Sequence, residues 1–387
     1  MKHYLIIGGG IIGSAVAREI LFQGKGKVTV LEKEDSLGKH GSGRNSGVLH
    51  SGINQKSGTL KARMCVEGNK LAVVYCKEHG VKVDECGTLV IARNSVEESK
   101  LEQLLTMGKE AGVRDLQIIS REELQEREPA VVGSKALLSP HGAVVDSVGF
   151  LKAVAAEAQS LGAQYHFNTR ADEILFDQIL TKKGTFYGSR VINCAGLYSD
   201  IFAHQSGVGK RFSIIPFRGE YQEVRGLQIN SMVYQIPDLR FPFLGVHFTR
   251  TIDGKVLAGP NATLSLGRES YEKQIHVGET TRMLAQPHFW ALLTHRSFFE
   301  LASYNLRMSL SKNAFLEEIQ SLAPSVKQED ITPYRAGIRA QMVNRRGRMV
   351  EDLVVESRKY STHVLNVVSP GMTTSLAVAG YIVNQLE

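Results

Sequence analysis

Three glycines near the start of the chain, Gly8, Gly10 and Gly13, constrain its fold more than any other feature. They stand between elements expected in the order strand, helix and strand, at Tyr4–Ile7, Gly13–Phe22 and Lys27–Leu31. In such a unit the first glycine permits a tight turn, the second lets backbone approach a pyrophosphate, and the third lets helix and strand pack closely. The pattern therefore predicts a dinucleotide site, with phosphates facing the N-terminus of the helix.

Glu32 supports this interpretation. It directly follows the second expected strand and lies 19 residues after Gly13, where an acidic residue typically binds the adenosine ribose. A carboxylate at this point repels a 2′-phosphate, which disfavours NADP. The turn itself does not decide between FAD and NAD.

Two further segments favour FAD. A polar, glycine-rich loop at Ser42–Ser51, which contains Arg44, Asn45 and Ser46, follows soon after the second strand and could lie along a long cofactor. A buried-type strand at Arg190–Cys194 ends in the small residues Ala195 and Gly196, which suits a second cofactor contact. The chain has one G-x-G-x-x-G turn and no redox cysteine pair, so we expect a small substrate to reduce the flavin directly.

The length of 387 residues exceeds one ordinary core and predicts two domains. We expect an α/β fold, in which a Rossmann-like, doubly wound FAD-binding domain is interrupted by an α+β substrate domain with a large antiparallel sheet. The expected FAD-binding segments are 1–85, 140–211 and 335–387, and the substrate domain takes 86–139 and 212–334. The four cysteines show no zinc-binding spacing, so no metal is expected.

Six basic side chains are candidates for the substrate site on chemical grounds. Oxidation of a hydroxy acid needs a base for the hydroxyl proton, and histidine suits this role near neutral pH. A carboxylate substrate also needs a cation, and a planar guanidinium can hold it through two hydrogen bonds. The candidates are His50, Lys61, Arg218, His247, Arg335 and Arg339.

Several longer segments then carry a specific resemblance. They are Arg44–Ile53, Leu60–Ala62, Pro216–Tyr221, Ile236–Asp238, Phe241–Thr249, Gly259–Ala262, Ala336–Gln341 and Ser369–Pro370. Through them the chain resembles, nearly end to end, the L-2-hydroxyglutarate dehydrogenase/oxidase family within the D-amino-acid-oxidase-like class of FAD enzymes.

The resemblance implies oxidation of L-2-hydroxyglutarate to 2-oxoglutarate, with electrons passing to oxygen or to a membrane quinone or other carrier. FAD would be bound by both ends of the chain, including the turn Ser369, Pro370 and Gly371. His50 matches a histidine beside the flavin ring, and Lys61, His247, Arg218 and Arg339 lie inside shared motifs. We assign His50, His247 and Lys61 to catalysis, with either histidine as the base, and Arg218 and Arg339 to substrate binding.

Of two departures from the family pattern, the first keeps other substrates open and the second bears on the affinity or redox poise of the cofactor. Asn54 and Gln55 stand where two tyrosines are usual, and the turn at Asn366–Thr373 reads Asn-Val-Val-Ser-Pro-Gly-Met-Thr. The alternative is therefore an oxidase of an amino acid, an amine or glycerol phosphate on the same fold.

The net charge of +7 suggests a remoter alternative, an RNA-modifying flavoprotein. The arginines are scattered and form no basic stripe interleaved with aromatic residues, so we expect no nucleic-acid partner. No apolar run reaches the ~18 residues that a membrane span needs, and only Met1, Lys2 and His3 precede the first expected strand. We expect a cytoplasmic protein and leave open a peripheral contact with the inner face of the membrane.

Overall fold

A largely parallel sheet organises the N-terminal and C-terminal parts of the chain. The computed structural model describes residues 1–237, 245–367 and 369–386. Within them this sheet has the order β20 (Val354–Ser357), β21 (Ser361–Asn366), β13 (Arg190–Asn193), β1 (Lys2–Ile7), β2 (Gly26–Leu31) and β9 (Gln164–His166). Only β20 and β21 pair antiparallel. The expected strand–turn–helix unit therefore lies in the middle of the sheet.

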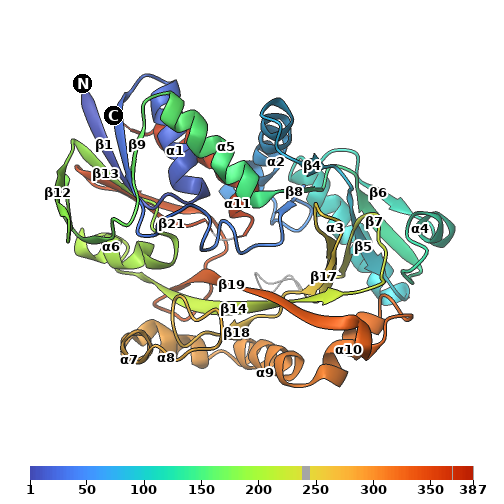
Figure 1. The fold of residues 1–387 in the computed structure, drawn as a ribbon. Helices are drawn as coiled ribbons and strands as arrows, with labels where there is room; N and C mark the ends of the chain where they lie inside the picture. The colour runs from blue at the N-terminus through green and yellow to red at the C-terminus, as the bar shows by residue number, and fades with distance from the viewer. Residues whose placement is uncertain (238–244, 368, 387) are drawn as a thin grey trace.

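Helices cover one face of this sheet (Figure 1). They are α1 (Ile11–Phe22), α2 (Leu60–Glu78), α5 (Ser147–Ser160) and α11 (Gly371–Val383), and α1 packs against both α5 and α11. The opposite face is covered by α6 (Ser199–Gln205) and by a small antiparallel sheet of β10 (Ala171–Leu175), β11 (Gln178–Thr181) and β12 (Gly184–Tyr187). The parallel sheet is thus buried on both sides, as in other doubly wound folds.

A second, mainly antiparallel sheet crosses the lower half of Figure 1. Its order is β18 (Thr263–Leu264), β14 (Phe212–Val224), β17 (Val256–Gly259), β16 (His247–Arg250), β15 (Met232–Gln235), β5 (Thr88–Ala92), β7 (Lys135–Ser139) and β6 (Gln117–Ile119). The long strand β19 (Ile331–Asn344) pairs with β14 from Phe212 to Val224. β-branched and aromatic residues recur on β14, β5, β6 and β15, which fits a pleated, half-buried surface.

Helices also cover the second sheet on the side away from the parallel sheet (Figure 1). They are α7 (Val277–Leu284), α8 (Pro287–Leu293), α9 (Arg296–Leu310) and α10 (Lys312–Gln320). At the other end of the sheet lie α3 (Ser95–Glu110) and α4 (Arg121–Arg127), the latter with the capping box of Ser120 and Glu123. The short strands β3 (Val48–Leu49), β8 (Ala143–Val145) and β4 (Val83–Asp84) join near α2.

The predicted mixed α/β fold is confirmed, with small shifts at element ends. Helix α1 begins at Ile11 rather than Gly13, because Gly10 already has the extended backbone of an N-cap. Strand β21 ends at Asn366, and the last helix begins at Gly371, within the turn Ser369–Gly371 that the sequence assigns to the cofactor. The motif segments Ile236–Asp238 and Phe241–Thr249 and the turn Asn366–Thr373 lie partly outside the described residues.

The assignment of chain segments to two domains stays a prediction. Strand β19 crosses the boundary that the sequence suggests between residues 334 and 335, and it pairs with β14 on both sides of that point. A boundary after Asn344 would keep the whole strand with its partner.

Candidate active site

The glycine turn after β1 is too crowded for side chains. Gly8 has a φ of +99°, and a Cβ there would lie 2.6 Å from the carbonyl oxygen of Cys194. A Cβ on Gly13 would lie 2.0 Å from the carbonyl oxygen of Gly8. The turn and the first turn of α1 therefore approach as closely as the sequence pattern requires.

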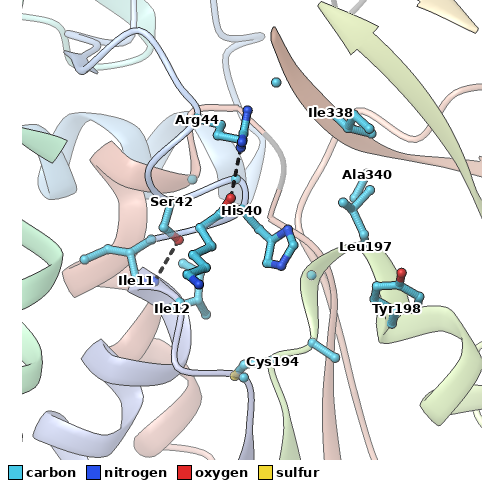
Figure 2. Close-up of a pocket in the computed structure, with 18 of the residues that line it drawn as sticks. Ile11, Ile12, His40, Ser42, Arg44, Cys194, Leu197, Tyr198, Ile338 and Ala340 are labelled. Carbon is cyan, nitrogen blue, oxygen red and sulfur yellow. Dashed lines mark hydrogen bonds between the residues drawn. The ribbon is translucent and has the colours of Figure 1, made fainter. Parts of the chain in front are cut away.

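The N-terminus of α1 is ready to receive an anion. Gly10 provides no side-chain cap, and Gly10, Ile11 and Ile12 line a cavity in front of the helix. Beside them Glu32 accepts hydrogen bonds from the backbone of Gly9 at 2.8 Å and of Glu34 at 3.0 Å. The N–H of Ile11 donates to Ser42 Oγ at 3.0 Å (Figure 2). Backbone N–H groups at a helix start and a carboxylate after the second strand match the phosphate and ribose of a dinucleotide.

The loop that contains Arg44, Asn45 and Ser46 is held in place by its own side chains and by β19. Asn45 Nδ2 donates to the carbonyl oxygen of Ser42 at 2.8 Å, and Arg44 lies 4.1 Å from the ring centroid of Tyr271. From β19, the guanidinium of Arg335 donates to the carbonyl oxygens of Gly43 and Asn45 at 3.1 and 2.6 Å. Arg335 thus fixes the loop rather than offering its charge to a substrate.

A cavity of about 620 Å³ runs between the parallel sheet and the antiparallel sheet. Figure 2 shows Ile11, Ile12 and Ser42 on one side of it and Leu197, Tyr198, Ile338 and Ala340 on the other. The predicted cofactor residues that line it are Gly8, Gly10, Glu32, Arg44, Asn45, Ser46, Ala195, Gly196, Ser369, Pro370 and Gly371. The structure brings these segments together from both ends of the chain, while Gly13 packs behind the turn.

Three of the candidate substrate residues, His50, His247 and Arg339, line the same cavity. Burial, and then the neighbouring groups His247, Lys61 and Arg339, lower the pKa of His50 to about 3. Burial also lowers the pKa of His247 to about 4, while its Nδ1 lies 2.8 Å from the carbonyl oxygen of Gly245. Both imidazoles are therefore neutral near neutral pH and able to accept a proton.

Lys61 stands at the start of α2, close to His50. Thr59 caps this helix through the N–H of Ala62, and Asp352 accepts the N–H of Lys61 at 2.8 Å. Burial lowers the pKa of Lys61. The side chain of Lys61 is not among those that line the cavity. Its positive charge helps to lower the pKa of His50, which does line the cavity.

Arg218 lies apart from the other candidates. Its guanidinium donates to the carbonyl oxygen of Tyr271 at 2.8 Å and forms an ion pair with Glu220. Glu220 in turn accepts a hydrogen bond from Ser309 of α9 at 2.7 Å, which places both residues on the helix-covered side of the sheet. A role for Arg218 in substrate binding stays a prediction that this arrangement does not favour.

Two residues at the site were not among the candidates. Tyr221 of β14 lines the cavity and is close enough to Arg339 to affect the pKa of its guanidinium. Thr373 in α11 accepts a hydrogen bond from the backbone N–H of His50 at 3.0 Å. Both stand inside or beside segments that carried the resemblance. Only strand pairing reveals that Tyr221 faces the cavity, and only helix packing reveals that Thr373 holds the backbone of His50.

An ion-pair network borders the ribose end of the cavity. Ligand atoms of Glu34, His40 and Glu269 lie within 4.8 Å of one another. The ammonium of Lys33 lies 2.7 Å from Glu34 and 2.6 Å from Glu269, and so already balances the two carboxylates. The expectation that the protein holds no metal stays a prediction.

Comparison with known proteins identifies the family. The model of the family described as FAD dependent oxidoreductase matches residues 3–385. The chain belongs to this family. FAD is therefore the cofactor, and the crowded glycine turn, the start of α1 and the cavity described above fit it. None of the helices in the described part of the chain combines the length and apolar character that crossing a bilayer requires.

Relatives within the family match along nearly their whole length. The chain is 36% identical to a protein of Indibacter alkaliphilus named L-2-hydroxyglutarate dehydrogenase, over 98% of this chain and 97% of the relative. A protein of the same name from Escherichia coli K12 is 32% identical, over 100% of this chain and 93% of the relative. The mitochondrial L-2-hydroxyglutarate dehydrogenase of Homo sapiens is 33% identical, over 99% of this chain and 88% of the relative.

Solved structures of more distant proteins share the fold. L-alpha-glycerophosphate oxidase from Mycoplasma pneumoniae with FAD bound has a TM-score of 0.79 at 24% identity, covering 100% of this chain and 96% of that one. Glycine oxidase from Geobacillus kaustophilus has a TM-score of 0.73 at 18% identity, covering 100% and 95%. At these identities the likeness supports the architecture of an FAD-dependent oxidoreductase and not a choice of substrate.

Proposed function

We propose that this protein is an FAD-dependent L-2-hydroxy-acid dehydrogenase or oxidase whose substrate is L-2-hydroxyglutarate. The observation that carries the proposal is the meeting of His50, His247 and Arg339 in the cavity that the cofactor residues line. The shared name of the full-length relatives supports the choice of substrate.

Oxidation of L-2-hydroxyglutarate breaks the C2–H and O–H bonds and forms a C2=O bond. Bound FAD supplies the acceptor for the hydride that leaves C2. The protein must therefore take up the hydroxyl proton, exclude water and hold two carboxylates. A base within hydrogen-bond reach of the hydroxyl typically contributes 10²–10⁴-fold to the rate.

Either His50 or His247 can accept that proton, because both imidazoles are neutral near neutral pH. The contact of His247 Nδ1 with the Gly245 carbonyl oxygen favours the tautomer with its proton on Nδ1, which leaves Nε2 free to accept. His50 is fixed through its backbone by Thr373 and lies nearer the charge of Lys61. A bound dicarboxylate would raise the pKa of both groups, because negative charge favours the imidazolium.

The carboxylates of the substrate would meet a positive site. Arg339 provides the planar guanidinium at the cavity wall, Lys61 adds charge behind His50, and Tyr221 offers a hydroxyl on the neighbouring strand. Burial is the main cause of the lowered pKa of His50, His247 and Lys61, and repulsion from the positive charge of Arg339 lowers all three further. A dianionic substrate would relieve that repulsion.

Anaerobic mixing of the holoenzyme with L-2-hydroxyglutarate tests the proposal. We expect the flavin absorbance to bleach, and we expect replacement of the base by alanine to slow bleaching by roughly 10²-fold or more. Comparison of His50→Ala with His247→Ala, each with a normal flavin spectrum, identifies the base. Failure to bleach with L-2-hydroxyglutarate, together with bleaching by an amino acid, an amine or glycerol phosphate, would replace the proposed substrate.

A second measurement on the same protein identifies the electron acceptor. We propose oxygen or a membrane quinone, and oxygen consumption during turnover with and without an added quinone separates the two. If the acceptor is a membrane quinone, we expect the protein to associate with the inner face of that membrane.

A further inference from the structure

A second cleft lies where three loops meet, and none of its described lining residues belongs to the cofactor cavity. It has a volume of about 440 Å³, which falls in the range of small-molecule sites. The loop after α6, the turn after β19 and the end of β20 form its walls. Its charged side chains are Lys210, Arg211, Arg345, Arg358 and a single carboxylate, Glu356.

Most of the positive charge in this cleft is unbalanced. Glu356 is paired with Arg211, whereas Lys210, Arg345 and Arg358 form no ion pair with any residue that the structure describes. Other cations on the surface do have carboxylate partners, among them Lys39, Lys77, Arg93 and Lys135. Because like charges held close together repel one another, an excess of three positive charges in one cleft predicts an anion that balances it.

Hydrogen bonds fix the loops that carry these cations. The N–H of Arg345 donates to the carbonyl oxygen of Arg211 at 3.1 Å, which joins the turn after β19 to the loop after α6. The N–H of Gly209 donates to Glu356 Oε2 at 3.1 Å, which joins the same loop to β20. The ring nitrogen Nε2 of His204 in α6 lies 3.2 Å from the carbonyl oxygen of Gly209. The backbone around the cleft is therefore in place before a ligand arrives, which lowers the cost of binding.

We infer that this cleft binds a small molecule that carries two phosphate groups. A terminal phosphate group carries about −1.5 to −2 charges at neutral pH, so two of them match the excess of positive charge. The guanidinium groups of Arg345 and Arg358 can each hold phosphate oxygens through two parallel hydrogen bonds. A single phosphodiester, as in a lipid headgroup, has one negative charge and would leave most of the repulsion in place.

Calorimetric titration of the FAD-loaded enzyme with inorganic pyrophosphate tests the inference. We expect one site per chain with a Kd below about 1 mM at low salt, and weaker binding as NaCl is added. The variant Arg345→Gln, Arg358→Gln should bind pyrophosphate about tenfold more weakly or worse. The control variant Arg114→Gln, Arg121→Gln removes the same charge from exposed positions near α4 and should bind as the wild type does.

Replacement of Glu356 by glutamine tests the same cleft with the opposite sign. The amide keeps an oxygen that can accept the N–H of Gly209, but the negative charge that pairs with Arg211 is lost. Removal of one like charge about 4 Å from the anion should make pyrophosphate bind about fivefold more tightly. Glu126→Gln, at an exposed position of α4, is the matched control and should leave Kd unchanged.

The controls and two competing anions decide the outcome. Equal weakening in both arginine variants would overturn the inference, as would a wild-type Kd above about 1 mM at low salt. Tighter binding of the tricarboxylate citrate would reject phosphate as the ligand group. Tighter binding of glycerophosphoglycerol, the soluble form of an anionic lipid headgroup, would reject a free ligand with two phosphates. Anaerobic flavin bleaching by L-2-hydroxyglutarate should be unchanged in every variant, so this result is independent of the proposed reaction.

Discussion

Replacement of Gly13 by alanine isolates the contribution of the tight turn to cofactor binding. The added Cβ would lie 2.0 Å from the carbonyl oxygen of Gly8. Nonbonded carbon contacts lie at about 3.5 Å, so the start of α1 must withdraw from the turn by roughly 1.5 Å. Overpacking of this kind costs about 1–3 kcal/mol. If the whole of this free-energy cost falls on cofactor binding, FAD should bind about 5- to 150-fold more weakly.

Titration of flavin-stripped protein with FAD, followed by flavin fluorescence, measures this loss. Gly380→Ala is the matched control, because Gly380 lies within α11, which packs against α1, and an added Cβ there meets nothing within 4 Å. It should bind FAD normally and raise Tm, since alanine is favoured over glycine in a helix by about 1 kcal/mol. Wild-type FAD affinity in Gly13→Ala, or an equal loss in Gly380→Ala, would refute the steric argument.

Three further predictions concern the site and its support. The pKa of His50 is lowered to about 3 and that of His247 to about 4, so the base stays neutral in mild acid. The rate of flavin reduction at limiting substrate should therefore stay constant from pH 8 to near pH 5. A fall in this rate centred near the ordinary histidine pKa of about 6.5 would contradict the prediction. Arg339→Gln should raise KM for L-2-hydroxyglutarate by about tenfold or more, because a charged hydrogen bond to the substrate is lost. Arg218→Gln should leave KM nearly unchanged. If steady-state assays show the larger rise in KM for Arg218→Gln, Arg218 is the residue that binds the substrate. Thr59→Ala removes the cap of α2 and should lower stability by about 1 kcal/mol, measured by urea denaturation, and an unchanged midpoint would exclude a role for the cap.

The cofactor half of the molecule could be predicted because its signals are local. The conformations that Gly8 and Gly13 must adopt follow from neighbouring residues, and the strand, helix and acidic residue at fixed spacings fix where the phosphates and ribose belong. The capping residues Ser120 and Asp146 likewise set helix starts through contacts three residues away. Such features depend little on the rest of the fold.

The substrate half depended on contacts that the sequence does not specify. Arg218 and Arg339 are both arginines inside motif-like segments of adjacent strands, yet Arg339 lines the cavity and Arg218 pairs with Glu220 on the opposite side. A strand sends successive side chains to opposite faces, so a shift of one residue reverses the outcome. Tyr221 escaped notice for the same reason, because only the pairing of β14 with β19 places it opposite Arg335, on the face of the sheet that also carries Arg339.

The sheet order also has a consequence for how the enzyme is made. Strand β1 and its glycine turn precede the antiparallel sheet in the sequence, but the turn Ser369–Gly371, which completes the same cavity, follows it. Lys25 then ties the first helix unit to the carbonyl oxygen of Val383 at the end of α11. A nascent chain can therefore build most of its antiparallel sheet before it is able to retain FAD, so cofactor capture requires that segments on both sides of that sheet in the sequence have folded together.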